Sequence, residues 1–175
     1  MAANGFPMLR HANADDLPRV VAIYNASIPG RLATADLSPV SVEDRRAWFD
    51  AHDATRRPLW ILGDDPDTWA WVSIRDFYEG RPAYARTAEI SIYVAPEFHG
   101  RGVGRHVLHE ALRQTPGLGI DCLLASVFDH NEPSLRLYEG AGFARWGHLR
   151  EIAELDGVRR GLVILGRRLS VNEGS

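Results

Sequence analysis

One stretch decides the fold of this chain: Thr87-Ala88-Glu89-Ile90-Ser91-Ile92-Tyr93-Val94-Ala95-Pro96-Glu97-Phe98-His99-Gly100-Arg101-Gly102-Val103-Gly104-Arg105. Its first half has the β-branched and aromatic residues of a strand, and the proline ends that strand. Alternate glycines then lead into a segment with helical apolar spacing. A strand that delivers a glycine loop to a helix N-terminus builds an anion cradle from main-chain N–H groups.

Strand alternation divides the first half of this stretch between two faces. Glu89, Ser91 and Tyr93 share one face, and the aliphatic residues Ile90, Ile92 and Val94 share the other. Burying a carboxylate in a central strand costs several kcal/mol, as a rough figure, unless the group is paired or used. Glu89 is therefore either a general base or one half of a structural ion pair with a nearby Arg.

The residues before this stretch predict a short strand, two helices and a hairpin. The short strand covers 7–10, and Asp15 or Asp16 caps a helix that ends near Ser27. An irregular loop over 28–39 follows, and Ser41 with Asp44 forms the capping box of a second helix. Strands over 59–62 and 69–74, joined by a turn over 63–67, form the hairpin.

The residues after the glycines predict a helix, a buried strand, a short helix and a final pair of strands. The apolar face of the first helix consists of Val103, Val107, Leu108, Ala111 and Leu112. The buried strand covers 121–127, Asn131 caps the short helix, and Gly140 ends it. Strands over 143–151 and 159–169 surround a turn at 156–157. The helical crossover makes strands 87–94 and 121–127 parallel neighbours, so we expect an α/β fold with a mixed, mostly antiparallel sheet.

Composition limits the class of protein. The 175 residues suit one domain over 1–175, and a net charge of −3 does not favour a nucleic-acid partner. All twenty basic residues are Arg, which excludes a P-loop lysine and a Schiff-base lysine. Cys122 is the only cysteine and lies in an apolar run, so we expect a buried, inert thiol and no disulfide.

The sequence lacks the patterns that indicate secretion, membrane insertion or metal binding. No secretory signal begins the sequence and no apolar run is long enough to span a membrane, so we expect a cytoplasmic protein. His106 and His109 lie three residues apart on the expected polar face of their helix. Neither an HExxH pattern nor a third ligand accompanies them, so we expect no metal site.

The glycine loop differs from the dinucleotide-binding fingerprint because its glycines alternate and the repeated βαβ halves are missing. Main-chain N–H groups and the helix dipole can hold a pyrophosphate there, with charge added by Arg101 or Arg105. The alternative is a tight connection that needs glycine only for its backbone angles.

The block from Glu89 to Phe143 resembles the Gcn5-related N-acetyltransferase (GNAT) superfamily. It has the strand ending Ile92-Tyr93-Val94, a loop similar to the superfamily's Gln/Arg-x-x-Gly-x-Gly/Ala pattern, and the run Asn131-Glu132-Pro133-Ser134-Leu135-Arg136-Leu137-Tyr138. Thr87 to Val94, Ile23-Tyr24-Asn25 and the segment from Asp44 to Phe49 more narrowly resemble the phosphinothricin and methionine-sulfoximine acetyltransferases. The superfamily's Gln/Arg position is His99 here.

This resemblance implies acetyl-CoA as cofactor, bound between the two splayed parallel strands. Splayed strands leave main-chain N–H and C=O groups that an amide-bearing pantetheine arm can pair with, and one N–H can hold the thioester carbonyl. The implied cofactor-binding residues are Ile92, Tyr93, Val94, His99, Gly100, Arg101, Gly102, Val103, Gly104, Arg105, Asn131 and Ser134.

The resemblance also assigns the base role to Glu89 and the protonation of the departing CoA thiolate to Tyr138. For Tyr138 the alternative is an aromatic ring packed against the cofactor. The acceptor is expected to enter from the loop with Arg31 and Thr34 and from the segment over 75–84. There Arg75 or Arg81 can bind a carboxylate or phosphinate, with Phe77, Tyr78 and Tyr84 as walls; the alternative is that these arginines are solvated loop charges.

We therefore expect an N-acetyltransferase that acts on the free amine of a small amino-acid-like molecule by direct transfer. Other acceptors compatible with the sequence are a polyamine, an antibiotic or a protein N-terminus. A non-catalytic acyl-CoA sensor is a further alternative, against which the presence of both Glu89 and Tyr138 argues. An exposed sheet edge and the habits of the superfamily predict a homodimer.

Overall fold

The computed structural model describes residues 5–64 and 67–169. Residues 1–4 of the N-terminal stretch, and Asp65 and Pro66 of the predicted turn over 63–67, lie outside the described residues. The order of helices and strands is the predicted one: β1 (Arg10–His11), α1 (Leu17–Ser27), α2 (Val42–Asp50), β2 (Leu59–Asp64), β3 (Asp67–Asp76), β4 (Thr87–Val94), α3 (Val103–Gln114), β5 (Cys122–Phe128), α4 (Glu132–Gly140), β6 (Ala144–Leu155) and β7 (Val158–Arg168).

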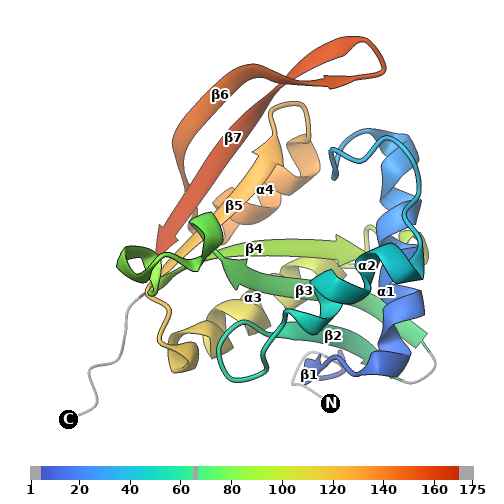
Figure 1. Cartoon of the computed structure of the whole chain (residues 1–175), viewed down its shortest axis with the longest axis vertical. Helices are drawn as coiled ribbons and strands as arrows, with labels where there is room; N and C mark the ends of the chain where they lie inside the picture. The colour runs from blue at the N-terminus through green and yellow to red at the C-terminus, as the bar shows by residue number, and fades with distance from the viewer. Residues whose placement is uncertain (1–4, 65–66, 170–175) are drawn as a thin grey trace.

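The strands form one sheet of seven in the order β1-β2-β3-β4-β5-β7-β6. Only β4 and β5 run parallel, and every other neighbouring pair is antiparallel. The parallel pairing covers three positions, from Thr87 opposite Cys122 to Glu89 opposite Leu124. Beyond that point the two strands diverge (Figure 1). The mixed, mostly antiparallel sheet with one splayed parallel pair is therefore confirmed.

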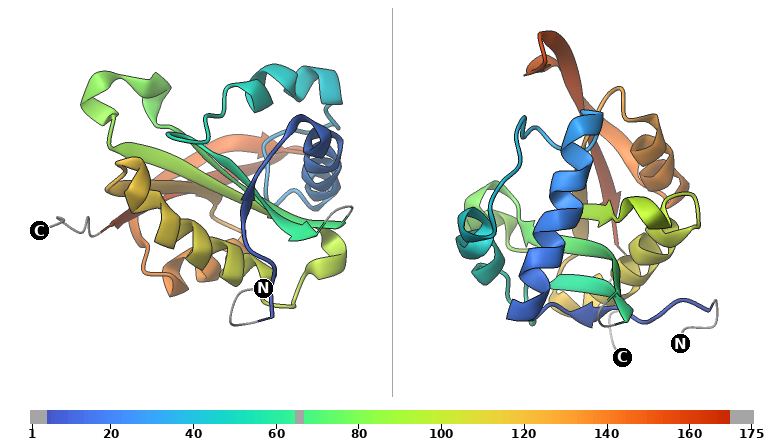
Figure 2. Two further views of the ribbon diagram at one scale, coloured as in Figure 1. Left: turned by 90° about the horizontal axis from the view of Figure 1, so that it is seen from below. Right: turned by 90° about the vertical axis from the view of Figure 1, so that its right-hand side faces the viewer.

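Helices cover both faces of the sheet (Figure 2). On one face α3 packs against β3 and β4, with α4 beside it, and this core includes the predicted apolar face of α3 and the aliphatic residues of β4. On the other face α1 and α2 enclose a smaller core with Val20, Trp71 and Tyr93. The predicted division of β4 between two faces is thus confirmed. Cys122 is buried in β5, also as predicted.

The two N-terminal helices begin in different ways. Ser41 and Asp44 form the predicted capping box of α2. Asp16, one of the two predicted caps, is the N-cap residue of α1, but its side chain makes no capping bond to that helix; the 3₁₀ turn before α1 is capped by Asn13. Asn13 accepts from the Asp15 N–H at 2.9 Å, and Asp16 accepts from the Asn13 N–H at 2.7 Å. Asn13 is as good a cap as Asp, so composition alone did not locate the first turn.

The prediction that His106 lies on a polar helix face is wrong. His106 is buried, and its ring stacks on Phe6 with ring centroids 4.7 Å apart. The N-terminal segment before β1 covers this side of α3, which helical spacing within α3 cannot indicate. His109 is exposed, so the two histidines do not converge. Within residues 5–64 and 67–169 no group of three or more His, Cys, Asp or Glu side chains is arranged to hold a metal ion.

In the part of the chain that the structure describes, every helix is too short or too polar to cross a bilayer.

Candidate active site

The divergence of β4 from β5 leaves main-chain groups of β4 without a strand partner. The carbonyl of Ile90 accepts from the Tyr138 hydroxyl at 3.5 Å, and the carbonyl of Val94 lies 2.9 Å from His99 Nε2. Both carbonyls therefore point away from β3. Main-chain direction alternates along a strand, so Ile92 presents its N–H and C=O to the same side. This edge can pair with an extended amide-bearing ligand.

A cavity of about 220 Å³ occupies this gap, and we call it the strand-gap cavity. It is bounded by β4, by the ends of β5 and β7, by α4 and by the loop between α1 and α2. Its lining includes six residues predicted from the sequence to contact cofactor, substrate or leaving group outside the glycine loop: Thr34, Ile92, Tyr93, Asn131, Ser134 and Tyr138.

The glycine loop at the end of β4 has the backbone geometry of an anion cradle. Gly100 and Gly102 have φ of 71° and 81°, a region that costs other residues about 1–2 kcal/mol. Gly102 is the N-cap of α3 and has no side chain that could cap the first turn. The N–H groups of the first turn, from Val103 onward, thus lack partners within the helix. Exposed Arg101 and Arg105 lie beside them. This chemistry fits a pyrophosphate.

Replacing Gly102 by Ala should weaken acetyl-CoA binding by about 10-fold, because a side chain at this φ distorts the donors of the first turn. Isothermal titration calorimetry measures the change. Gly119→Ala is the matched control, since Gly119 has φ of 73°, also faces open space and lies at the far end of α3. Both variants should lose about 1–2 kcal/mol of unfolding free energy. Equal acetyl-CoA affinity in the two variants would contradict the cradle.

A second cavity of about 130 Å³ lies on the opposite face of β4, beneath α1 and α2, and we call it the helix-face cavity. Its floor follows three pairs of residues directly opposite each other on β3 and β4. Trp71 faces Tyr93 with stacked rings 4.4 Å apart, Ser73 faces Ser91, and Arg75 faces Glu89. The full lining is Val20, Val21, Tyr24, Arg45, Trp48, Trp71, Ser73, Arg75, Ser91 and Tyr93. The floor therefore changes from aromatic to hydroxyl to charged.

Arg75 forms the charged end of this floor, and Glu89 lies opposite it on β4, next to the lining residue Ser91 on the same face. Burial raises the pKa of Glu89 above its usual 4.5, and the Arg75 charge opposes part of that rise. None of the ion pairs between described residues includes Arg75, whose side chain is exposed. A partly buried carboxylate with a raised pKa is suited to accept a proton, and an unpaired guanidinium is suited to bind a carboxylate.

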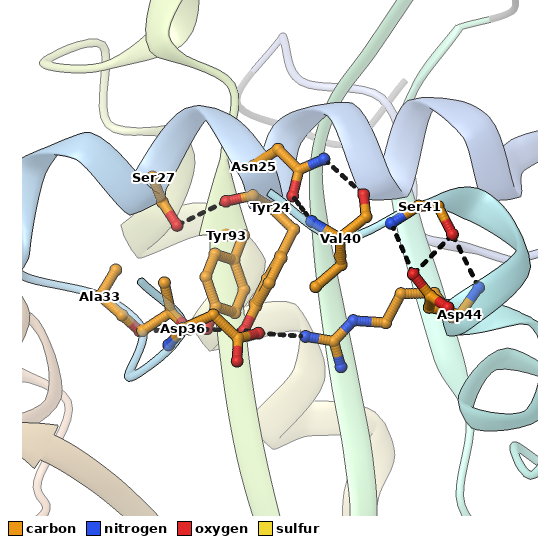
Figure 3. A network of polar contacts seen from close by, with 11 residues as sticks. Tyr24, Asn25, Ser27, Ala33, Asp36, Val40, Ser41, Asp44 and Tyr93 are labelled. Carbon is orange, nitrogen blue, oxygen red and sulfur yellow. Dashed lines mark hydrogen bonds and ion pairs between the residues drawn. The ribbon is translucent and has the colours of Figure 1, made fainter. Parts of the chain in front are cut away.

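The wall of the helix-face cavity contains a polar network that sequence reasoning missed (Figure 3). Asp36 accepts from the Tyr24 hydroxyl at 2.5 Å and from Arg45 Nη2 at 3.0 Å. The Arg45 guanidinium lies 4.2 Å from the centre of the Tyr24 ring, and the Tyr93 hydroxyl donates to the Ala33 carbonyl at 3.0 Å. These contacts fix the loop between α1 and α2 against the sheet. Burial is the main reason that the pKa values of Tyr24 and Tyr93 are raised.

The same loop is attached at its other side to α4 and the β6–β7 hairpin. Asn131 caps α4 by accepting from the Ser134 N–H at 3.2 Å, and its Nδ2 donates to the Leu32 carbonyl at 2.9 Å. Arg31 Nε donates to Asp156 at 2.7 Å, so this guanidinium is engaged in a structural contact. The predicted cap role of Asn131 is confirmed, whereas Arg31 lies in neither cavity lining.

Three further residues predicted for the acceptor pocket lie elsewhere in the described structure. Phe77 and Tyr84 pack edge to face with ring centroids 5.2 Å apart, and Arg81 lies 5.3 Å from the centre of the Tyr78 ring. This cluster follows β3 and lines neither cavity. Of the residues proposed for that segment, only Arg75 lines the helix-face cavity.

Tyr138 is buried beneath the strand gap, where its ring packs edge to face on Phe143. Burial raises the pKa of its phenol above the usual 10. The hydroxyl therefore keeps its proton and acts as a hydrogen-bond donor toward the gap.

The fold and the site define a class. A mixed sheet with one splayed parallel pair, a glycine cradle at the end of the splayed strand and a cavity in the gap form the GNAT architecture. The sequence model of the acetyltransferase (GNAT) family matches residues 19–143. The chain belongs to this family.

Individual relatives cover nearly the same length. The Bacillus subtilis protein YwnH, provisionally named as a phosphinothricin acetyltransferase, is 52% identical over 93% of this chain and 99% of its own. An L-methionine sulfoximine/L-methionine sulfone acetyltransferase of Pseudomonas paraeruginosa is 28% identical over 83% of this chain and 85% of its own. The crystal structure of a Sinorhizobium meliloti phosphinothricin acetyltransferase in complex with acetyl-CoA superposes with a TM-score of 0.86. Its identity is 25%, and it covers 96% of this chain and 91% of that chain.

These similarities establish the reaction class. The protein is an acetyl-CoA-dependent N-acetyltransferase.

Proposed function

We propose that this enzyme acetylates the free amine of a small amino-acid-like acceptor that binds in the helix-face cavity. The observation that carries the proposal is the pair of Glu89 and Arg75, which lie opposite each other on β4 and β3 where Arg75 lines one end of the cavity floor. An α-amino acid has its amine and carboxylate on the same carbon, and side chains opposite each other in a sheet are about 5 Å apart. The amine then meets the carboxylate while Arg75 binds the acid group. The names of the P. paraeruginosa and S. meliloti relatives specify amino-acid analogues.

The proposed mechanism assigns the proton to Glu89. Acetyl-CoA supplies an activated acetyl thioester. The carboxylate of Glu89 removes a proton from the acceptor ammonium, directly or through one water, which exposes the nitrogen lone pair. The Ile92 N–H at the unpaired edge of β4 is a donor for a carbonyl oxygen on which negative charge develops. Arg75 holds the acceptor so that its nitrogen faces β4.

We also propose direct transfer, which is supported by the residues that line the two cavities. Ser91 and Tyr93 line both, so the strand-gap and helix-face cavities adjoin at β4. Cys122, the only cysteine of the chain, is buried and lines neither cavity. We propose that donor and acceptor occupy the two cavities together.

Replacement of Tyr138 by Phe should lower kcat about 10- to 100-fold. In the proposed mechanism its hydroxyl donates to the departing thiolate, and a hydrogen bond to a charged group contributes about 1.5–3 kcal/mol. Phe keeps the ring that packs on Phe143, so acetyl-CoA affinity and thermal stability should change little. Steady-state kinetics measure kcat, and calorimetry measures the acetyl-CoA affinity and the thermal stability. An unchanged kcat would mean that Tyr138 only packs against the cofactor.

The acceptor class is tested by the release of CoA thiol across a panel of amines. The panel contains methionine sulfoximine, phosphinothricin, common L-amino acids, their decarboxylated amines, a polyamine, an aminoglycoside and a short peptide. The proposal predicts turnover with the amino-acid members and at least 10-fold lower kcat/KM for the decarboxylated amines. Preference for the polyamine, the antibiotic or the peptide would replace this acceptor class. Tight acetyl-CoA binding without release for every amine would indicate a sensor.

We also propose a homodimer in which the β6 edge of the sheet contacts a second copy. β6 is the last strand in the sheet order, and the β6–β7 hairpin projects from the body of the molecule (Figure 1). Apolar side chains that are about half exposed lie along it: Trp146, Leu149, Ile152 and Val158. Exposed apolar residues on an unpaired edge are typical of an interaction surface.

Ile152→Lys should convert this dimer to a monomer, because a charge would be buried at the interface. Light scattering coupled to size exclusion measures the mass. Met8→Lys is the control, since Met8 is as exposed as Ile152 but lies before β1. A monomeric native protein at micromolar concentration would contradict the proposed dimer.

A further inference from the structure

His52 makes a hydrogen bond to a residue of the helix-face cavity that the proposed mechanism does not use. It lies two residues after α2, and its Nε2 is 2.7 Å from Ser73 Oγ. Ser73 is buried in β3, faces Ser91 across the floor and lines the cavity. His52 itself does not line the cavity. It can therefore affect a bound acceptor through Ser73, through its edge-to-face ring contact with Trp48 at a centroid distance of 4.7 Å, or through the nearby Arg75 charge.

The surroundings of the other ring nitrogen determine which tautomer His52 adopts. Nδ1 is 3.0 Å from the Trp48 carbonyl and 3.2 Å from the Phe49 carbonyl. A carbonyl oxygen only accepts hydrogen bonds, so Nδ1 must hold the ring hydrogen. Burial lowers the pKa of His52 more than the hydrogen bonds to the Phe49 and Trp48 carbonyls raise it, and the nearby Arg75 charge lowers it further, so the ring is neutral at pH 7. In this neutral form Nε2 has a lone pair and no hydrogen.

The tautomer in turn fixes the direction of the Ser73 hydroxyl. A serine has one hydrogen to donate, and Nε2 can only accept. The hydrogen of Ser73 therefore points at His52, away from the cavity. The lone pairs of Ser73 Oγ are what the hydroxyl offers to a ligand, so it acts there as a hydrogen-bond acceptor.

The position of Ser73 in the cavity makes its role as a hydrogen-bond acceptor relevant to how a substrate binds. Ser73 is two residues from Arg75 on β3, and Ser91 opposite it is two residues from Glu89 on β4. An acceptor-only oxygen at this point favours a ligand N–H and disfavours a carboxylate oxygen. An amino-acid-like ligand is thereby held with its nitrogen over the serines and its acid group at Arg75.

We propose that His52 is a positioning residue, which turns Ser73 into an obligate hydrogen-bond acceptor for the amine of the substrate. This inference rests on the proposed function, because it needs an amine in the helix-face cavity. It assigns a role in acceptor orientation to a residue that touches neither the acceptor nor acetyl-CoA.

A double-mutant cycle tests the proposal with the best acceptor from the amine panel. Ser73→Ala should raise the acceptor KM about 10-fold, with little change in kcat or in the acetyl-CoA KM. His52→Phe should raise the acceptor KM to a similar extent, because a freed hydroxyl can donate into the cavity. The double variant should be no worse than Ser73→Ala alone. His52→Gln should restore the native KM, since the Gln carbonyl can accept the Ser73 hydrogen.

Three results would overturn the proposal. Equal effects of His52→Phe with and without Ser73 would indicate that His52 acts through packing. A collapse of kcat in Ser73→Ala would make Ser73 a nucleophile. The third is a spectroscopic result on the native protein, which needs no variant to fold: ¹⁵N chemical shifts of the His52 ring should report a hydrogen on Nδ1 at pH 7, and a hydrogen on Nε2 would refute the argument.

The two proposals can fail separately. The nuclear magnetic resonance measurement uses the native enzyme without acceptor, so it stands whatever amine is turned over. An amine panel without amino-acid turnover contradicts the proposed function. Normal amino-acid turnover with additive effects in the cycle contradicts the role of His52 alone.

Discussion

Replacement of Glu89 by Gln should lower kcat about 10²- to 10⁴-fold, the usual contribution of a general base. Gln keeps the shape of the side chain and cannot take the proton. Acetyl-CoA affinity should be unchanged, because Glu89 lines neither cavity directly and lies on the opposite face of β4 from α3. Stopped and steady-state assays of thiol release measure the rate, and calorimetry measures the affinity. Glu139→Gln is the control, since Glu139 only pairs with Arg145 on the surface.

The pH profile supplies an independent test of the same residue. A base must be ionised to act, so activity falls as the pH decreases through the pKa of Glu89. That pKa is raised by burial, which places the acidic limb of kcat/KM above pH 4.5. Glu89→Gln should abolish this limb. A variant that kept the native rate and limb would remove Glu89 as the base and leave it as the partner of Arg75.

Replacement of Arg75 by Met should raise the acceptor KM about 10- to 100-fold, because the carboxylate loses a charged hydrogen-bond donor. It should also move the acidic limb to higher pH, since the Arg75 charge is what opposes the raised pKa of Glu89. Steady-state kinetics between pH 5 and 8 measure both effects.

Arg81→Met is the matched control for Arg75. The sequence proposes both arginines for the acceptor, whereas in the structure Arg81 lies beside the Tyr78 ring, outside both cavities. Its acceptor KM should change less than twofold. A larger effect in Arg81→Met than in Arg75→Met would place the acceptor at the segment after β3 instead.

Local sequence patterns were sufficient for the fold because the decisive signals are short-range. The alternation of β4, the glycines before α3 and the capping box of Ser41 each involve residues a few positions apart. The right-handed crossover rule then makes β4 and β5 neighbours. The extent of the splay is a property of register, and the three paired positions that precede it have no sequence signal.

The residues expected to bind the acetyl donor were easier to predict from the sequence than those expected to bind the acceptor, for a physical reason. Main-chain donors of a glycine loop depend on local backbone angles, which glycine spacing reports. The helix-face cavity is assembled from α1, α2, β3 and β4, so its members lie up to about 70 positions apart. In the sequence, nothing distinguishes Arg45 from the other residues of a charged helix, or His52 from the other residues that follow its end. Their roles come only from contacts with Asp36 and Ser73.

Aromatic residues close to Arg75 in the sequence led to a wrong prediction for the walls of the acceptor pocket. Phe77 and Tyr84 lie close to Arg75 in sequence and were predicted to form walls of the acceptor pocket. In the structure they pack on each other after β3, while Trp48, Trp71 and Tyr93 line the cavity. The strand period of two puts Trp71 and Arg75 on the same face, so extending strand alternation from β4 to β3 is the signal that could have found this wall.

A crystal structure of the enzyme with acetyl-CoA and the N-acetylated product of its best amino-acid substrate would show where the acetyl donor and the acceptor bind. We predict the pyrophosphate on the N–H groups of Gly102 to Arg105 and the pantetheine arm along the Ile90 to Val94 edge of β4. The product should lie in the helix-face cavity, with its acid group at Arg75 and its nitrogen nearest Glu89 and Ser73. A product bound elsewhere, with the helix-face cavity empty, would contradict the proposal that the acceptor binds in this cavity.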